Sequence, residues 1–288
     1  MKKGANIKHS EWDLTIKPKS KWYDFKISEI IRYKDLLILF VKRDFVALYK
    51  QTILGPLWFI LQPAVTTITF SVIFGNLAKI PTDGMPSILF YISGITLWNY
   101  FSDTLNKTSD TFTTNAHIFG KVYFPRMIVP LSVVLSNMIK LGIQFLLFLI
   151  IWIYYCINAP ESIHPNRTLV LLPFLILLMG ILGLSMGIII SSLTTKYRDM
   201  KFLVSFGVQL LMYASPIVFP LSIVPESYKL LILANPITSI IETFKYAFLG
   251  VGVFNPYHLL YSSCFALILF FTGLIIFHKV EKSFMDTV

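Results

Sequence analysis

Arg43 and Lys50 are the side chains best placed to bind an anion. They lie in the segment 40–63, FVKRDFVALYKQTILGPLWFILQP, and after Lys50 the next formal charge is Lys79. A guanidinium can hold two phosphate oxygens at once, whereas an ammonium acts as a compact point charge. The residues alone leave two interpretations open: recognition of a particular phosphate, and general contact with anionic lipid headgroups.

Motifs for catalysis and for nucleotide binding are missing from the sequence. The Gly-Lys of HIFGKV resembles part of a phosphate-binding loop, but Asn115 stands in the place of its first glycine and Val122 in the place of its Ser or Thr. There is no DxD, no HExxH and no neighbouring pair of carboxylates, and Cys156 and Cys264 show no metal-ligand spacing. The sequence therefore predicts no catalytic residue, no metal site and no cofactor in this chain.

Composition and charge-free runs predict an all-α integral membrane protein. The 288 residues are 55% hydrophobic and only 14% charged, whereas about a quarter of the residues of a soluble domain are charged. Because roughly 20 apolar residues cross the hydrocarbon core of a bilayer, six runs qualify as spans. The runs without Asp, Glu, Lys or Arg are 51–78, 84–102, 141–160, 168–195, 202–225 and 246–278. Buried helices of a soluble protein would give shorter runs, interrupted by charged faces.

The distribution of Lys and Arg predicts that both termini are cytoplasmic. Residues 1–50 carry twelve of these cations, and the N-terminal part of this segment lacks the apolar stretch of a signal peptide. Together with the loops 103–126 and 196–201 and the C-terminal tail, twenty cations lie on one side, against four in the other loops. Positive charge is enriched on the cytoplasmic side of membrane proteins. The net charge of +10 is thus explained without a nucleic-acid-binding module.

Three segments depart from simple spans. Residues 28–50 are amphipathic and predict a helix along the cytoplasmic membrane surface. Lys140 interrupts the third apolar segment, so we place it near the cytoplasmic boundary, with 127–139 continuing the helix below the bilayer; a position facing a polar pathway stays open. The apolar run 230–241 is too short to cross and lies in a proline-rich region, which predicts a re-entrant hairpin before the last span, 258–277.

The predicted spans also bear on packing and on the energy source. Gly183 and Gly187 form a GxxxG, which permits close approach of two helices, within one subunit or between two. The spans contain no carboxylate, which argues against a carrier driven by protons or sodium. A pore protein without its own energy source needs a partner that supplies one. We divide the chain into a cytoplasmic N-terminal segment, 1–53, and a six-helix transmembrane domain, 54–288.

Six segments resemble a known family in their order and spacing. They are VKRDFVALYKQTILGPLWFILQP, YISGITLWNYFSD, NAHIFGKVYFPRMIVP, KYRDMKF, YASPIVFP and NPIT. Over residues 20 to 288 the chain resembles the membrane permease of ABC exporters that move lipid-linked polysaccharide, the Wzm-type O-antigen permease. Teichoic-acid permeases are close relatives of that family.

This resemblance implies an architecture and a set of partners. It implies six transmembrane helices in the bacterial inner membrane and a homodimer whose pore forms between the two copies. It also implies two copies of a separate ATPase subunit, which bind ATP and Mg and dock on a coupling helix in the first cytoplasmic loop. In this chain the coupling helix would present Asn115, Ile118, Phe119 and Lys121. The implied cargo is an undecaprenyl-pyrophosphate-linked polysaccharide, O-antigen or similar, exported to the periplasmic side.

The resemblance also implies a route for the cargo. The undecaprenyl-pyrophosphate head would be admitted where the interface helix turns into the first span, at Arg43, Lys50, Leu54 and Gly55. Aromatic rings suit a glycan path because sugar faces stack on them, but an ordinary aromatic belt at the membrane surface is the alternative for each ring. The aromatic candidates are Trp58, Phe59, Trp98, Tyr100, Phe101, Tyr213 and Phe219.

Two other functions stay open at this point. One is an ABC-type exporter with a different cargo, such as teichoic acid, a lipid or a drug. The other is a membrane-embedded glycosyltransferase or polymerase that acts on lipid-linked sugars. The missing carboxylates and catalytic motifs argue against this enzyme, so we expect a transporter subunit rather than an enzyme.

Overall fold

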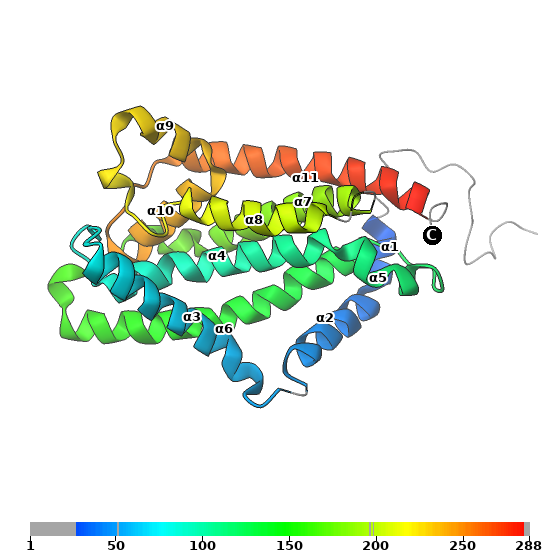
Figure 1. The fold of residues 1–288 in the computed structure, drawn as a ribbon, viewed down its shortest axis with the longest axis horizontal. Helices are drawn as coiled ribbons and strands as arrows, with labels where there is room; N and C mark the ends of the chain where they lie inside the picture. The colour runs from blue at the N-terminus through cyan, green and yellow to red at the C-terminus, as the bar shows by residue number, and fades with distance from the viewer. Residues whose placement is uncertain (1–26, 51, 196, 198, 285–288) are drawn as a thin grey trace, which may run out of the picture.

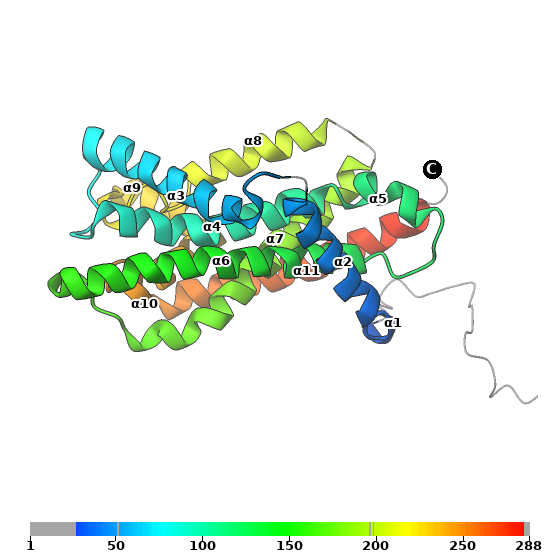
Figure 2. The ribbon, with the colours of Figure 1, turned by 90° about the horizontal axis from the view of Figure 1, so that it is seen from below.

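Every regular element in the described part of the chain is a helix. The computed structural model describes residues 27–50, 52–195, 197 and 199–284. Long helices run side by side along the longest axis of the molecule, and α2 crosses them obliquely (Figures 1 and 2). The α-helices are α1 (Ile27–Arg32), α2 (Lys34–Tyr49), α3 (Trp58–Phe70), α4 (Ser87–Ser109), α5 (Thr111–Phe119), α6 (Ile128–Asn158), α7 (Leu172–Thr194), α8 (Met200–Tyr213), α9 (Glu226–Ala234), α10 (Pro236–Leu249) and α11 (Pro256–Phe284). Short helical segments are Gly55–Leu57, Ser71–Leu77, Pro160–Ser162, Arg167–Leu171 and Leu221–Ile223.

The two ends of the bundle differ in what covers them. The short helix α5 and the C-terminal part of α11 lie at one end, and the short helices α9 and α10 lie at the other (Figure 1). We call these the α5 end and the α9 end. In the topology predicted from the sequence, the α5 end is cytoplasmic.

Helix α4 forms the centre of the bundle. Its side chains from 89 to 98 are all buried. A Cβ on Gly183 of α7 would lie 2.9 Å from the carbonyl oxygen of Phe101, and one on Gly187 would lie 2.5 Å from Thr108 Cβ. The GxxxG therefore brings α7 against α4 of the same chain, which answers the question that the sequence left open.

Four helical stretches in the described residues are long and apolar enough to cross a membrane. They are Gly55–Leu77, Ile128–Asn158, Arg167–Thr194 and Pro256–Glu281. Helix α8, with 14 residues, is shorter than a full span, and α4 carries charged side chains toward its C-terminal end. The all-helical membrane fold is confirmed, whereas the number of six spans and the orientation of the termini stay predictions. Helix α6 is continuous through residues 128–139, as predicted.

The predicted interface helix is present as two helices. Tyr33 separates α1 from α2, and α2 packs against α6. Phe40 of α2 is buried, while Ile38 and Leu39 are 63% and 58% exposed. Large exposed apolar side chains on a short helix suit a position at a membrane surface. Residues 1–26 of the predicted N-terminal segment lie outside the described residues, and the domain division at residue 53 stays a prediction.

A tight turn leads from α2 into α3. Gly55 has a φ of 51°, a left-handed conformation that costs glycine little because it has no Cβ. Pro56 follows in the first turn of the short helix Gly55–Leu57, where its missing N–H is tolerated. Pro63 lies inside α3, which continues as a π-helix over Ser71–Leu77. The Leu-Gly-Pro of the sequence is therefore the turn into the first apolar helix.

The predicted hairpin before the last span corresponds to α9 and α10. Asn235 divides the apolar run 230–241, and its side-chain oxygen caps α10 by accepting from the Ile237 N–H at 3.1 Å. Helix α10 ends at Leu249, and on the following Gly250 an added Cβ would lie 2.7 Å from the carbonyl oxygen of His164. Most of α10 is buried, whereas α9 buries none of its side chains. The re-entrant position of these helices in a membrane stays a prediction.

Candidate functional site

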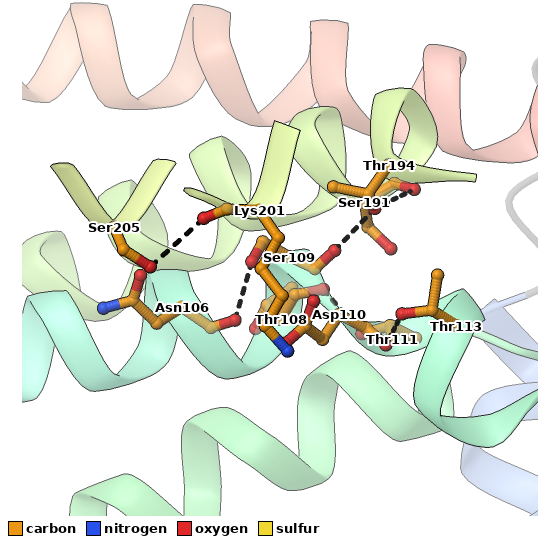
Figure 3. Close-up of polar contacts among 10 residues, drawn as sticks. All are labelled: Asn106, Thr108, Ser109, Asp110, Thr111, Thr113, Ser191, Thr194, Lys201 and Ser205. Carbon is orange, nitrogen blue, oxygen red and sulfur yellow. Dashed lines mark hydrogen bonds and ion pairs between the residues drawn. The ribbon is translucent and has the colours of Figure 1, made fainter. Parts of the chain in front are cut away.

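A polar junction at the α5 end joins four helices (Figure 3). The hydroxyl of Thr194, at the end of α7, donates to the carbonyl oxygen of Ser109 at the end of α4, at 2.9 Å. Lys201 of α8 forms an ion pair with Asp110, between α4 and α5, at 2.6 Å. These contacts hold the first turn of α5 against α4, α7 and α8, so the segment predicted to dock a partner is attached to the bundle.

An aromatic cluster anchors the rest of α5. The five buried rings belong to Phe40, Phe112, Phe119, Phe124 and Phe277. Phe112 stacks on Phe277 of α11, with ring centroids 4.8 Å apart. Phe124 lies 5.7 Å from Phe119 on one side and 5.7 Å from Phe40 of α2 on the other. Helix α5 is therefore packed against α11, and the loop after it is packed against α2.

Arg126 closes this cluster on its α11 side. Its Nη1 donates to the carbonyl oxygen of Glu281 at 2.5 Å, and its guanidinium lies 5.6 Å from the ring centroid of Phe119. Glu281 Oε2 lies 3.2 Å from His278 Nδ1. Burial lowers the pKa of Arg126, and the negative charge of Glu281 acts in the opposite direction. The loop after α5 is thus fixed to the last helix.

The four predicted docking residues differ in exposure. Phe119 is 4% exposed and Asn115 is 8% exposed, with Asn115 Nδ2 donating to the carbonyl oxygen of Thr111 at 3.0 Å. Ile118 is half-buried, and Lys121 is exposed. Their docking role stays a prediction, and a partner would first meet the exposed side chains. These are Thr113, Thr114, His117, Lys121, Val122 and Tyr123.

The predicted phosphate-binding residues lie at or beside the α2–α3 corner, which we define as residues 50–57. Arg43 Nη2 lies 2.8 Å from Asp44 Oδ1, and the guanidinium stands 4.5 Å from the ring centroid of Phe40. The Arg43 side chain remains 40% exposed, so part of its fork is free to bind another acceptor. Lys50 is exposed, while Leu54 and Gly55 are half-buried. Their role in admitting a lipid headgroup stays a prediction.

An ion pair lies beneath this corner. Lys140 Nζ of α6 is 2.7 Å from Asp103 Oδ2 of α4, and the two side chains are 14% and 29% exposed. Lys140 Nζ is also 5.8 Å from the ring centroid of Phe59 of α3, which in turn lies 6.0 Å from the ring of Phe45 of α2. The corner therefore covers a charged link between α4 and α6. Lys140 was predicted from the sequence as a charge at the membrane boundary, whereas Asp103, which directly follows the charge-free run 84–102, was not predicted to have a role.

Polar side chains on α3, α4 and α8, which we call the polar face, lie among exposed apolar ones such as Val65 and Phe206. Gln62 of α3 and Gln209 of α8 are exposed, and within the described residues neither amide has a hydrogen-bond partner. Helix α4, which contacts both α3 and α8, adds the half-buried side chains of Asn99, Ser102 and Asn106. An amide costs free energy in an apolar environment when it has no partner. This face therefore suits water or another protein surface better than lipid.

The predicted glycan-path aromatics fall into two groups. Trp58 of α3 and Tyr213 of α8 are 48% and 47% exposed, and Phe219 is half-buried. The other four are core side chains, namely Phe59, Trp98, Tyr100 and Phe101, each 6% exposed or less. A ring in the core stacks on protein, so a glycan could reach these four only if the bundle opened. The role of the group in glycan binding stays a prediction.

Two buried charges on α10 were missed by the sequence analysis. Lys245 Nζ donates to the carbonyl oxygen of Pro216 at 2.6 Å and lies 3.4 Å from the ring centroid of Phe90. Glu242 Oε2 accepts from the Val253 N–H at 3.1 Å. Lys245 was assigned to an external loop, yet it is 1% exposed and Glu242 is 2% exposed. The sequence does contain a signal for this pair: a Glu and a Lys three residues apart in a largely apolar segment lie on one face of a helix.

Comparison with known proteins gives a consistent result. A family model described as ABC-2 type transporter matches residues 35–249, from α2 to the end of α10. An O-antigen export system permease protein RfbA from Klebsiella pneumoniae is 28% identical over 253 residues, which cover 88% of this chain and 94% of the relative. The protein of the same name from Myxococcus xanthus is 25% identical over 264 residues, 91% of this chain and 98% of the relative. Polysialic acid transport protein KpsM from Escherichia coli is 24% identical over 239 residues, 81% of this chain and 89% of the relative.

These matches confirm the family resemblance that the sequence segments indicated. The family model covers most of the chain and includes the corner, the ion pair beneath it and α5. This chain belongs to the ABC-2 transporter membrane family.

Proposed function

We propose that this chain is the membrane subunit of an ATP-driven exporter of undecaprenyl-pyrophosphate-linked polysaccharide. The cargo, O-antigen or a similar glycan, would move from the cytoplasmic to the periplasmic side of the bacterial inner membrane. Family membership and the permease names of the relatives support this proposal. The structural observation that carries it is the polar face of α3, α4 and α8.

This polar face supports a path shared by two copies of the chain. A hydrophilic glycan needs polar surroundings to cross the hydrocarbon core. In a single chain the amides of Gln62 and Gln209 lie on the outer surface of the bundle. A second copy facing the first would cover them and enclose a polar path between the two. Trp58 and Tyr213, exposed on the same two helices, would line this path with rings.

The α5 end supports docking of a separate ATPase subunit. The sequence contains no phosphate-binding loop of its own, so hydrolysis belongs on a partner, with two copies of the partner for two copies of this chain. Helix α5 begins at the junction of α4, α7 and α8, its ring of Phe112 stacks on α11, and the loop after it packs on α2. A displacement of α5 would therefore be transmitted to the other helices of the bundle. In this arrangement both termini are cytoplasmic.

The α2–α3 corner supports admission of a lipid headgroup. Arg43 and Lys50 offer positive charge where α2, with its exposed apolar side chains, meets the first apolar helix. A pyrophosphate at this place would find a guanidinium fork and an ammonium. The left-handed turn at Gly55 brings α3 back over α4 and α6, so a lipid that follows the corner approaches the bundle.

A relative with a different named cargo favours a second candidate function. The Escherichia coli protein named for polysialic acid transport covers 81% of this chain at 24% identity. An acidic polysaccharide is therefore the alternative cargo, with the same coupling to an ATPase.

Deletion of the gene for this chain from the bacterium that carries it tests the proposed function. Without it, lipid-linked polysaccharide should accumulate on the cytoplasmic face of the membrane and disappear from the cell surface. Binding of a glycan-specific lectin to intact and to lysed spheroplasts measures both pools. Unchanged surface polysaccharide without accumulation inside would overturn the proposal.

A further inference from the structure

Five charged side chains lie on α2, α4 and α6 near the α2–α3 corner. They are Arg43, Asp44, Asp103, Lys107 and Lys140. Arg43 pairs with Asp44 at 2.8 Å, and Lys140 pairs with Asp103 at 2.7 Å. Both carboxylates of the group are thus paired with a cation. One positive charge is left over, and it belongs to Lys107.

A neutral side chain holds Lys107 in place. Lys107 Nζ donates to Asn137 Oδ1 at 3.1 Å, and Asn137 Nδ2 donates to Thr104 Oγ1 at 3.3 Å. Asn137 is only 1% exposed, whereas Lys107 is exposed. The amide orients the ammonium but does not cancel its charge, and an ammonium carries further N–H donors.

Lys107 lies on α4 beside the Asp103–Lys140 pair. It follows Asp103 by four residues, so the two share one face of α4, with Lys107 nearer the α5 end. Asn137, the hydrogen-bond partner of Lys107, belongs to α6, and α2 packs on α6. An anion that left Arg43 toward the bundle would therefore meet Lys107 before the neutralised pair.

We propose that Lys107, oriented by Asn137, binds a phosphate of the cargo's polyprenyl-pyrophosphate head after that head has passed Arg43. This inference rests on the proposed function, because it assigns a binding residue to the same route. A phosphate at Lys107 would neutralise the charge that the group leaves unpaired. Charge-assisted hydrogen bonds of this kind are the stronger ones in proteins.

A purely structural link between α4 and α6 is the alternative role for Lys107, and one substitution separates the two. Asn137→Asp keeps the shape of the side chain and gives Lys107 a carboxylate partner. A structural link would be strengthened by this change or left intact. A phosphate site would lose its unpaired charge and would bind less ligand although the fold is kept.

The test is binding of radiolabelled undecaprenyl pyrophosphate to the full chain, assembled with its ATPase subunit in nanodiscs. Lys107→Gln and Asn137→Asp should each weaken binding by about tenfold, the value of one charge-assisted hydrogen bond. Lys107→Arg should retain most of the affinity. Lys279→Gln, which removes an exposed cation at the same end of the bundle, is the matched control and should bind as the wild type does. Thermal unfolding of each variant accompanies the binding assay.

Competition identifies the source of the phosphate. Unlabelled undecaprenyl pyrophosphate should displace the probe, whereas inorganic pyrophosphate or phosphatidylglycerol at the same concentration should not. Equal displacement by inorganic pyrophosphate would overturn the lipid as the source. Wild-type affinity in both Lys107→Gln and Asn137→Asp would refute the site at Lys107 and leave the proposed cargo standing. A wild type that prefers undecaprenyl pyrophosphate no more than phosphatidylglycerol would contradict the proposed cargo itself.

Discussion

Lys140 Nζ lies 2.7 Å from Asp103 Oδ2, and this ion pair joins α6 to α4 beneath the α2–α3 corner. The two residues are 37 positions apart in the sequence, and their side chains are largely shielded from solvent. A charge in such surroundings is tolerated when it is paired, and it becomes costly when the partner is removed. The pair therefore fixes the relative position of α4 and α6 beneath the corner at which the cargo's proposed route begins.

Breaking this pair should destabilise the fold. Asp103→Asn should lower the free energy of unfolding by about 2 kcal/mol, because Lys140 keeps its charge and loses its carboxylate. The double variant Lys140→Met, Asp103→Leu should lose less free energy of unfolding than the sum of the losses in Lys140→Met and in Asp103→Leu. Unfolding in detergent, followed by intrinsic fluorescence, measures these differences. Lys229→Met breaks an exposed pair with Glu226, whose side chain is 87% exposed, and should change stability by less than about 1 kcal/mol. Equal losses in Asp103→Asn and in this control would argue against a structural role for the buried pair.

Substitutions on α5 and in the loop that follows it should separate folding from docking. Phe119→Ala should destabilise the chain by about 3 kcal/mol, because it removes a ring from the aromatic cluster. Lys121→Glu, at an exposed position, should leave stability unchanged and weaken copurification of the ATPase subunit. Thermal unfolding and copurification are measured on the same preparations. Loss of docking in Phe119→Ala at unchanged stability would instead place this ring in the docking surface.

Cross-linking should detect the second copy of the chain. In a background with Cys156 and Cys264 replaced, Gln62→Cys and Gln209→Cys should form cross-linked dimers with a short bifunctional reagent in native membranes. Ile150→Cys, on the exposed surface of α6, should give none, because the proposed interface lies on α3 and α8. Gel mobility without reductant reads out the result. Dimers from Ile150→Cys alone would contradict the proposed arrangement.

Thiol labelling should establish the orientation. Ser227→Cys on α9 should react with an impermeant maleimide in intact cells, because the α9 end is predicted to face the periplasm. Thr113→Cys on α5 should react only after permeabilisation. Both positions are exposed, whereas Ser109, in the same predicted loop as Thr113, is 2% exposed and would be a poor probe. The reverse pattern of labelling would invert the topology.

The sequence predicted the long helices well because charge-free runs do not depend on tertiary contacts. The run 51–78 contains the helical stretch Gly55–Leu77, and the helix through Lys140 extends back to Ile128 as expected. The turn at Leu54 and Gly55, which the family resemblance implied, is present: glycine permits the left-handed backbone there, and proline fixes φ in the residue that follows.

Side-chain environments were harder to predict. Nearly every side chain from 89 to 101 is buried, so α4 has no apolar stripe from which to tell core rings from path-lining rings. Trp98 and Phe101, two of the candidates for a glycan path, pack in the core. The structural role of Asp103 depends on its contact with Lys140, 37 positions away in the sequence. No local pattern reveals this contact. Lys245 was read as a loop cation because run length alone did not predict the helix that buries it.

Transport by purified components tests the central claim most directly. The chain is reconstituted with its ATPase subunit in liposomes that contain lipid-linked polysaccharide, and glycan crossing the membrane is measured by lectin binding. Transport should require both subunits and ATP. Arg43→Ala should reduce it by about tenfold, with Arg43→Lys in between because an ammonium lacks the bidentate fork. Lys42→Ala, at the neighbouring exposed cation, should transport close to the wild-type rate. Transport that proceeds without ATP, or no transport of lipid-linked polysaccharide by the complete assembly, would contradict the account.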